Sequence, residues 1–515
     1  MHTIRFRIKT LPGQNCELEK RFRAVWHIHN EMVSYAQRCL NLLFRDRQYL
    51  DARQAYADAS RRLKKMDGKH GGKAFREREK ELTAQKRAAA NALNERTSAC
   101  GISKVQFDRY VSVMQKAFRH LVSSQQAQKE AERVLAGVEK VLYGNGKRVH
   151  MKRLADQHTV SQKCATNGVK VNLSAGTATW GNLVLKLDID FGDPYVKESI
   201  SSDLCYAEIS RLPFRNGYHY YVTLILKGPA PEKLSVKNSG GVTGIDPGVS
   251  TIAAVSGGSV LLEELAPMAK QYDRKIAKQQ RLVDADLRRD NPENYNPDGT
   301  VKRGRRRWKL SKGCRRRKQE IRVLQRKKAA AVRDSHNRLA NRLITENGPL
   351  FITEEMDYRA LKKRSKAKPE RRLIPSVIRK KDGTEQTVYK YKKKRRFGLS
   401  VGSRAPASLL SILARKAQQY GGQLVTVNTR LFRASQYHHD TGEYIRTALS
   451  DRWKIISGHR VQRDLYSAFL ILCSDPSGTS PDRDMCTSLF PGFCNLHDKF
   501  VTETKSTPHP ACFGY

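Results

Sequence analysis

A short stretch near the middle of the chain, Val242 to Val255, places the tightest constraint on the fold. It consists of two apolar runs rich in β-branched residues, separated by Asp246-Pro247-Gly248. This pattern is typical of a strand, a tight turn and a return strand. Pro247 cannot donate to a β-ladder and Gly248 tolerates positive φ, so a sharp turn is expected. The carboxylate of Asp246 is therefore predicted at a strand end, facing a cleft.

Two later segments also place a carboxylate at the end of an apolar element. The first, Leu-Phe-Ile-Thr from Leu350, reads as a short buried strand and ends in Glu354 and Glu355. The second places Asp464 at the N-terminus of a helix with an apolar face. That face is formed by Leu465, Ala468, Phe469 and Leu472. An isolated Asp-Pro-Gly favours an ordinary turn aspartate, but three acids from distant segments could meet and bind a metal.

The order and spacing of these motifs resemble the split RuvC-type, RNase H-fold nuclease of the TnpB family, the transposon-encoded relatives of type V CRISPR effectors. The matching motifs are Gly-Ile-Asp-Pro-Gly at Asp246, acid-acid-Met at Glu354, and Arg-Asp at Asp464. The resemblance covers about half of the chain, from roughly residue 241 to residue 475. It implies an RNA-guided DNA endonuclease. The nearest alternative is a compact type V CRISPR effector, which takes its guide from a CRISPR array.

By this resemblance Asp246, Glu354 and Asp464 are the catalytic residues and the metal ligands. They would hold two Mg²⁺ or Mn²⁺ ions about 4 Å apart for in-line phosphodiester hydrolysis. Glu355 is the rival of Glu354, because neighbouring residues of a strand point to opposite faces. The family's acid-acid-Met pattern favours Glu354. Retention of all three acids disfavours a guide-directed DNA-binding repressor without cleavage.

The charge of the chain points to nucleic acid as the partner. Its 515 residues include 97 Lys and Arg against 50 Asp and Glu, a net charge of +47. Such an excess repels itself without a polyanion. The resemblance implies guide RNA and double- and single-stranded target DNA. No apolar run reaches the length of a membrane helix, so no membrane partner is expected. A cytoplasmic, nucleoid-associated prokaryotic protein is predicted, and the sequence does not predict its oligomeric state.

The most basic segment lies in a helical insertion expected over 266–345, broken at Asn291 to Gly299. So many like charges favour a phosphate-lined channel over a solvated helix, which is the alternative. Trp308 could stack on unpaired bases or serve as a packing anchor. A second basic run follows the second acid. The residues predicted to contact nucleic acid are Arg305, Arg306, Arg307, Arg315, Arg316, Arg317, Lys318, Arg322, Lys393 and Arg395.

The chain is predicted to be an α+β multidomain protein. Alternating residues and the hairpin signal at Arg215-Asn216-Gly217 indicate strands, and helical spacing recurs from Leu18 to Leu40. By resemblance, the expected parts are a small wedge-like β-barrel, an inserted α-helical recognition lobe, an RNase H-like (RuvC) α/β nuclease domain and a C-terminal extension. Their ranges are 1–12 with 148–238, 13–147, 239–475 and 476–515.

Residues 430–460 depart from the family, whose members usually carry a four-cysteine zinc ribbon there. The cysteines are absent, and His438, His439 and Asp440 have no fourth ligand at a suitable spacing, so structural zinc is not expected. Tyr466 stands two residues after Asp464, where the family commonly has Asn. The C-terminal extension is expected to be poorly specified, and it contains irregularly spaced cysteines and a histidine. These are Cys486, Cys494, His497 and Cys512.

Overall fold

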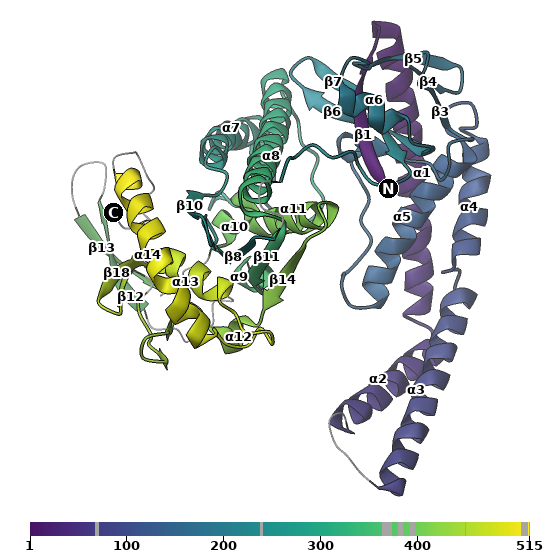
Figure 1. Ribbon diagram of the computed structural model, residues 1–515. Coiled ribbons are helices and arrows are strands. Elements are labelled where there is room, and N and C mark those ends of the chain that lie inside the picture. The colour runs from purple at the N-terminus through teal and green to yellow at the C-terminus, as the bar shows by residue number, and fades with distance from the viewer. Residues whose placement is uncertain are drawn as a thin grey trace. The chain divides into compact units, whose positions relative to one another are not determined.

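The computed structural model describes residues 1–66, 72–236, 240–362, 373–379, 385–391, 397–448, 450–505 and 513. These residues form two compact units, Met1–Pro231 and Glu232–Tyr515 (Figure 1). Each unit combines helices with β-sheet, in agreement with the predicted α+β multidomain class. Across the described ranges, none of the helices combines the length and apolar character needed to cross a bilayer.

The first unit contains a seven-stranded antiparallel sheet with the order β2-β6-β7-β1-β5-β4-β3. Its sixth and seventh strands form the predicted hairpin, in which Phe214 pairs with Gly217 and Gly217 adopts φ 119°. β3 also contacts β6, although the two lie far apart in the sheet order. Closure into a wedge-like barrel stays a prediction. The strands are β1 (His2–Lys9), β2 (Thr159–Val160), β3 (Val169–Asn172), β4 (Thr177–Trp180), β5 (Leu183–Asp188), β6 (Leu204–Phe214) and β7 (Gly217–Leu226).

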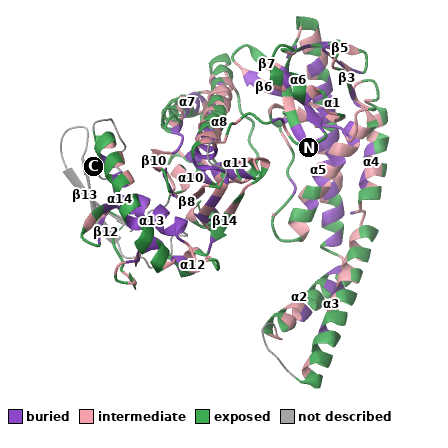
Figure 2. Ribbon diagram, in the orientation of Figure 1, coloured by how far each residue is buried: buried purple, intermediate pink, exposed green. Residues whose placement is uncertain are grey.

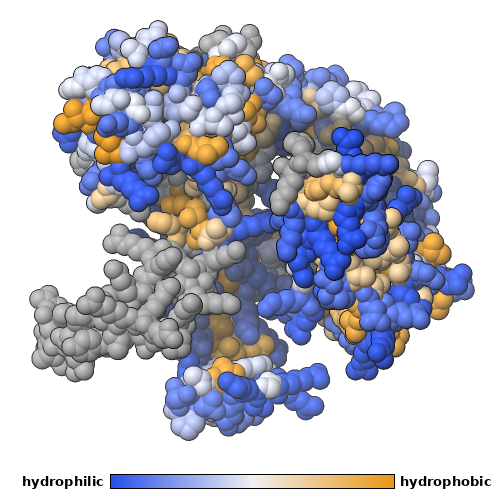
Figure 3. All heavy atoms as spheres, turned by 90° about the horizontal axis from the view of Figure 1, so that it is seen from below, coloured by the Kyte–Doolittle hydropathy of each residue, from blue (hydrophilic) through white to orange (hydrophobic). Residues whose placement is uncertain are grey.

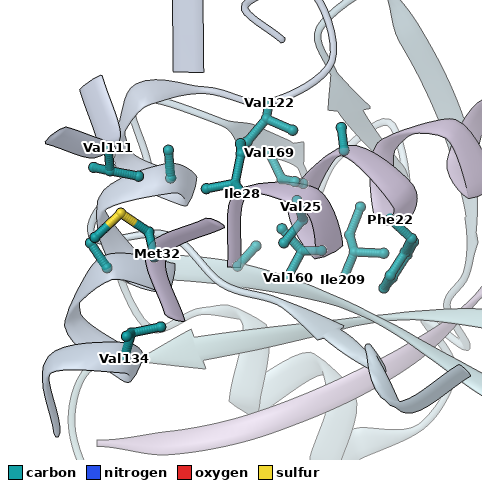
Figure 4. Packing of buried hydrophobic residues seen from close by; sticks show 14 of the residues in the cluster. Phe22, Val25, Ile28, Met32, Val111, Val122, Val134, Val160, Val169 and Ile209 are labelled. Atoms are coloured by element: carbon teal, nitrogen blue, oxygen red, sulfur yellow. The ribbon is translucent and has the colours of Figure 1, made fainter. Parts of the chain in front are cut away.

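Helices supply the rest of the first unit, and the apolar face predicted for the first of them is confirmed. Phe22, Val25 and Met32 are fully buried in a core shared with the sheet, where Val160 and Ile209 lie beside them (Figure 4). The sequence also predicts a helix break in the Gly-rich stretch from Asp67 to Gly72. Residues 67–71 of this stretch lie outside the described residues. The helices are α1 (Pro12–Leu43), α2 (Arg47–Met66), α3 (Lys73–Ala99), α4 (Lys104–Lys116), α5 (Ser124–Leu142) and α6 (Pro194–Ile200), with the 3-10 turn η1 (Leu154–Asp156).

The second unit is built on a five-stranded mixed sheet with the order β10-β9-β8-β11-β14. The first three strands are antiparallel neighbours, whereas β11 runs parallel to both β8 and β14. The carboxyl ends of β8, β11 and β14 therefore meet at one edge. The strands are β8 (Val242–Pro247), β9 (Thr251–Ser256), β10 (Val260–Glu264), β11 (Leu350–Glu354) and β14 (Gln423–Val427).

Helices cover both faces of this sheet. On one face Ile245, Ile252 and Phe351 pack against α8 and α11. On the other face Ala253 and Val255 pack against α13 and α14. The helices are α7 (Ala269–Asp290), α8 (Lys312–Asn347), α9 (Tyr358–Lys362), α10 (Gly398–Arg404), α11 (Pro406–Gln419), α12 (Thr429–Phe432), α13 (Arg463–Leu472) and α14 (Arg483–Lys505), with the 3-10 turn η2 (Pro292–Asn294).

Three two-stranded hairpins complete the second unit. Two of them occupy the region predicted as a degenerate zinc ribbon. The hairpins are β12 (Leu373–Arg379) with β13 (Glu385–Tyr391), β15 (Tyr437–His438) with β16 (Glu443–Tyr444), and β17 (Trp453–Ile456) with β18 (His459–Gln462).

The basic insertion differs from the prediction, which broke its helix only at Asn291 to Gly299. The helical structure is interrupted up to Ser311, which caps α8 by accepting the backbone N–H of Cys314. The side chain of Asn291 bonds both backbone groups of Lys309, and this holds the segment outside a helix. Arg305, Arg306 and Arg307 therefore lie in a connecting segment.

The prediction of a poorly specified C-terminal extension is wrong for residues 483–505. This segment is helix α14, and its Phe490, Phe493 and His497 are buried at helical spacing against the second unit's core. Cys486 and Cys494 are buried free thiols, as predicted, whereas Cys512 lies outside the described residues. Apolar burial at spacings of three and four residues explains why the segment is ordered.

Gly244 permits a very close approach of α13 to β8. A Cβ atom at this position would lie 2.2 Å from the carbonyl oxygen of Ala468 and 2.4 Å from the backbone nitrogen of Leu472. Helix α13 is buried on all sides from Leu465 onward, as Figure 2 shows. It is thus the central helix of the unit, buried well beyond the one apolar face that the sequence predicts. Only glycine leaves room for it at this point of the strand.

We expect Gly244→Ala to destabilise the second unit by about 3 kcal/mol or more, because the new methyl group meets backbone that cannot move without shifting α13. Gly257→Ala is the matched control, since no heavy atom lies within 4 Å of its Cβ position. Urea unfolding followed by circular dichroism measures both variants. Equal stability of the two would contradict the close approach.

Candidate active site

Two of the predicted acids lie side by side at the carboxyl edge of the sheet. The parallel register pairs Ile245 of β8 with Thr353 of β11, so the next residues, Asp246 and Glu354, are neighbours. Ile245 is buried against α8 and α11. Because successive residues of a strand point to opposite faces, Asp246 and Glu354 lie on the face that α13 covers.

Asp464 reaches the same face from the first turn of α13. The side chain of Gln462 caps this helix by accepting the backbone N–H groups of Asp464 at 2.7 Å and Leu465 at 2.9 Å. The cap fixes the start of the helix, and the close packing at Gly244 fixes its distance from β8. The structure therefore brings the three predicted acids together from three distant segments.

The electrostatics of the site reflect this proximity. Burial, followed by the negative charges of Asp464 and Glu354, raises the pKa of Asp246 well above its usual range. Burial also raises the pKa of Glu354 to about 7, although a hydrogen bond from the backbone of Ala434 acts in the opposite direction. Two carboxyl groups of the site are thus costly to ionise without a cation nearby.

Glu355, the rival of Glu354, is placed differently. Its side chain is exposed, and its backbone N–H donates to the carbonyl of Val427 at 3.1 Å. The hydroxyl of Thr429 donates to its carbonyl at 2.6 Å. The residue therefore belongs to the junction between β11 and the end of β14, outside the group formed by Asp246, Glu354 and Asp464.

Two arginines hold Asp464. Arg463 donates from Nε and Nη2 to its Oδ1 at 3.1 and 3.0 Å, and Nη1 of Arg452 lies 3.4 Å from its Oδ2. Arg463 is itself anchored, because its Nη1 donates to the carbonyl of Asp451 at 3.1 Å. Both oxygens of Asp464 thus face guanidinium groups, which balance its charge and fix its orientation.

Tyr358 is a member of the site that the sequence did not reveal. Its hydroxyl donates to the carbonyl of Pro247 at 3.1 Å, directly after Asp246. Burial, together with the charges of Asp246 and Glu354, raises the pKa of this hydroxyl. The only sequence signal was its position four residues after Glu354, because its partner lies 111 residues away. Tyr358 thus ties the helix that follows β11 to the turn that follows β8.

The three carboxylates fit a divalent metal ion in their chemistry. Carboxylate oxygens are the ligands that Mg²⁺ and Mn²⁺ prefer, and α13 brings them to one face of the sheet. The raised pKa of Asp246 reports burial and the negative charges of Asp464 and Glu354, whereas that of Glu354 reports burial, and a bound cation would relieve both. The site thus has carboxylate donors and, at Asp246 and Glu354, charge that a cation would balance, but its three carboxylates do not bring their oxygens within 4.8 Å of one another.

A separate group of possible metal ligands lies at α14. Among the described residues, only His459, His497 and Asp498 bring three such ligand atoms within 4.8 Å of one another. Nε2 of the buried His497 accepts the backbone N–H of Gln462 at 2.9 Å, so the ring proton of the neutral imidazole is on Nδ1. Nδ1 faces Asp498 at 2.9 Å. This arrangement ties α14 to Gln462 and leaves His497 without a free nitrogen for a metal.

The candidate zinc ligands of region 430–460 have separate roles. Nδ1 of His439 lies 2.8 Å from the hydroxyl of Tyr466, inside the core. Asp440 accepts the backbone N–H of Ser457 at 2.8 Å, and the pKa of His438 is lowered, first by burial. Tyr466 is fully buried in this core, so its departure from the family's Asn does not alter the group of acids.

The predicted nucleic-acid contacts fall into two sets. Exposed side chains form the first set: Arg305, Arg306, Arg307, Arg315 and Arg316. Partly buried side chains form the second: Arg317, Lys318 and Arg322, of which Arg317 pairs with Asp286 of α7. Lys393 and Arg395 lie outside the described residues. Hydrophilic side chains dominate the face of the molecule seen in Figure 3.

Comparison with solved structures finds Cas12f proteins. The Cas12f1-sgRNA-target DNA complex, solved by cryo-electron microscopy, matches with a TM-score of 0.43 and 7% identity, over 92% of this chain and 98% of that chain. A CRISPR-Cas12f ternary complex matches with a TM-score of 0.26 and 10% identity, over 92% and 99%.

No protein-family model matches the sequence, and no curated protein is similar to it. At identities of 7% and 10% the structural likeness concerns the course of the chain alone. The roles of individual residues therefore have to be argued from the geometry of the site.

The raised pKa values predict how the stability of the metal-free protein depends on pH. A carboxyl group whose pKa is higher in the folded chain favours folding below its unfolded pKa of about 4, and this contribution is lost as the pH rises through the folded pKa. For Glu354 that value is about 7. We expect Asp246→Asn to raise the free energy of unfolding by about 1 to 3 kcal/mol at pH 8 and by little at pH 4.5.

Asp475→Asn provides the opposite control. Burial raises the pKa of Asp475, but hydrogen bonds from Ser477, Thr479 and Ser480 outweigh burial and lower it to about 2. The ionised form of Asp475 therefore favours folding, and its Asn variant loses stability at pH 8. Urea unfolding in EDTA at both pH values measures the two variants. An Asp246→Asn protein less stable than the parent at pH 8 would contradict the electrostatic account.

Proposed function

We propose that this chain is an RNA-guided DNA endonuclease that hydrolyses phosphodiester bonds at a single acidic site. The observation that carries the proposal is the meeting of Asp246, Glu354 and Asp464 on one face of the sheet. The order of their motifs, which resembles TnpB nucleases, supports it, and so does the net charge of +47. The Cas12f1 neighbour was solved with sgRNA and target DNA, and we assign the same classes of partner to this chain.

In the proposed mechanism Asp246, Glu354 and Asp464 hold two Mg²⁺ or Mn²⁺ ions. In that position these residues would provide a site for ions whose chemistry would activate a water and stabilise the leaving 3′ oxygen in in-line hydrolysis. Gln462 sets the position of Asp464 through the helix cap, and the two arginines restrict its rotation. The hydroxyl of Tyr358 fixes the carbonyl of Pro247 and thereby the turn that aims Asp246.

The origin of the guide separates the two closest versions of this function. A TnpB-like nuclease takes its guide from a transposon end, whereas a compact type V effector takes it from a CRISPR array. A guide-directed repressor would bind the same partners without cutting DNA. It would have no need of a site in which two carboxyl groups have a raised pKa and a third is paired with arginines. In each case the protein acts where DNA is, so we place it with the nucleoid of a prokaryotic cell.

Substituting Glu354 and Glu355 one at a time distinguishes the proposed metal ligand from its neighbour in the sequence. We expect Glu354→Gln to lower Mg²⁺-dependent cleavage by at least about 100-fold, because it removes one of three charged ligands, and to abolish the rise in melting temperature on adding Mg²⁺. Glu355→Gln is the matched control and should keep both properties, since its side chain is exposed. Cleavage that survives Glu354→Gln and fails in Glu355→Gln would reverse the assignment.

The proposed function as a whole is tested by purifying the protein from cells that carry its locus and sequencing the RNA bound to it. The complex is then incubated with Mg²⁺ and a plasmid library that holds a guide match beside randomised flanks. We expect loss of plasmids that share one flank, and no loss with Asp246→Asn. The origin of the RNA decides between transposon and CRISPR guides. Binding without any cut by the parent protein would establish the repressor instead.

A further inference from the structure

The segment between α7 and α8, residues 302–309, has a backbone that buried side chains hold in place. Asn294, 5% exposed, donates from Nδ2 to the carbonyl of Arg307 at 2.8 Å. Asn291, fully buried, accepts the N–H of Lys309 at 2.6 Å and donates to its carbonyl at 3.0 Å. The N–H of Lys302 donates to the carbonyl of Asn294 at 2.9 Å. The buried side-chain amides of Asn291 and Asn294 thus form hydrogen bonds that fix the backbone of one exposed basic segment.

The cations of this segment have no acidic partner among the described residues. Arg305 and Arg307 are exposed, and Arg306 donates only to backbone carbonyls of the segment itself. Several cations of the adjoining helices behave differently. Arg288 pairs with Asp284, and Arg317 pairs with Asp286. The fold therefore pairs some of the cations on both sides of the segment with acids, whereas those within it are left to bind an anion.

An aromatic ring is presented beside these cations. Trp308 is 37% exposed and meets Tyr295 edge to face, with ring centroids 5.8 Å apart. Tyr295 is itself held by the guanidinium of Arg288, which lies 4.9 Å from its ring centroid. An exposed indole supported from one side by a fixed ring is a surface on which an unpaired base can stack. A duplex keeps its bases paired and stacked, so it cannot use this ring.

We propose that residues 302–309 form a binding site for single-stranded nucleic acid, in which Arg305 and Arg307 contact phosphates and Trp308 stacks on a base. This inference rests on the proposed function in taking a nucleic acid as the partner, but it does not depend on cleavage. Contacts to phosphates and to the face of a base make the site tolerant of sequence. The clamp by Asn291 and Asn294 holds the cations and the ring in one arrangement before the ligand arrives.

The test measures binding of fluorescein-labelled dT8, U8 and an eight-base-pair duplex by anisotropy, with every variant made in an Asp246→Asn background. Trp308→Ala should weaken binding of dT8 by about 5- to 100-fold and leave duplex binding within about twofold. Arg305→Gln combined with Arg307→Gln should weaken single-strand binding and lower the salt slope by about 1.4. The ratio of dT8 to U8 affinity shows whether DNA or RNA is the preferred strand.

Lys275→Gln combined with Lys278→Gln is the matched control, because it removes two exposed charges of α7 in the same insertion that pair with no acid in the described part of the chain. It should change dT8 binding by less than about twofold. Asn294→Ala keeps every charge and the ring, and it should weaken dT8 binding by releasing the carbonyl of Arg307. Circular dichroism verifies that each variant is folded.

Two results would overturn the site: dT8 binding that is unchanged in Trp308→Ala, or losses in the arginine variant no larger than those in the lysine control. The second result would mean that the chain attracts polyanions by its overall charge alone. If the parent protein never cuts DNA, the proposed function fails. The binding comparisons remain a valid test of the site, because none of them involves cleavage.

Discussion

The second unit depends on the contact between α13 and β8, where no side chain separates helix from strand. Gly244 makes this approach possible, and the backbone of Ala468 and Leu472 occupies the space that any other residue would fill. The start of the same helix carries Asp464, and the end of the same strand carries Asp246. The separation of two acids is thus set by backbone packing, which is stiffer than any arrangement of long side chains.

Bringing carboxylates together inside a fold is unfavourable, and aromatic packing beneath α13 offsets it. His439 packs against Phe490, with ring centroids 4.7 Å apart, and Phe469 stacks on Phe493 at 4.7 Å. Each buried ring of this size contributes about 1.5 to 3 kcal/mol. TnpB proteins, whose nuclease motifs this sequence resembles, usually carry a four-cysteine zinc ribbon in this region. Here a hydrogen bond between His439 and Tyr466, together with aromatic contacts, occupies the corresponding place.

Local patterns in the sequence were sufficient to find the strands that end in Asp246 and Glu354, the buried face of α1 and the hairpin at Gly217. In each case the signal lies within a few neighbouring residues. The spacing of Phe490, Phe493 and His497 is an equally local signal and is typical of the helix α14 that they occupy.

Other features depend on partners far along the chain. The hydroxyl of Tyr358 bonds a carbonyl 111 residues away, and Asn291 holds Lys309 across 18 residues. Neither bond leaves a trace in local propensity, so the sequence predicts too short a break before α8 and gives no sign of the role of Tyr358. The choice between Glu354 and Glu355 needed the register of β11 against β8, which only the folded sheet supplies.

The order of elements along the chain also shapes how the protein is made. Strand β8 ends at Pro247, but α13 begins at Arg463, and His497 of α14 holds the residue that caps α13. During synthesis the apolar face of the central sheet that α13 covers therefore stays exposed until the ribosome has completed the intervening residues. Contacts between distant segments form late and slowly. A nascent chain is consequently incapable of assembling its acidic centre before α13 and α14 have been made.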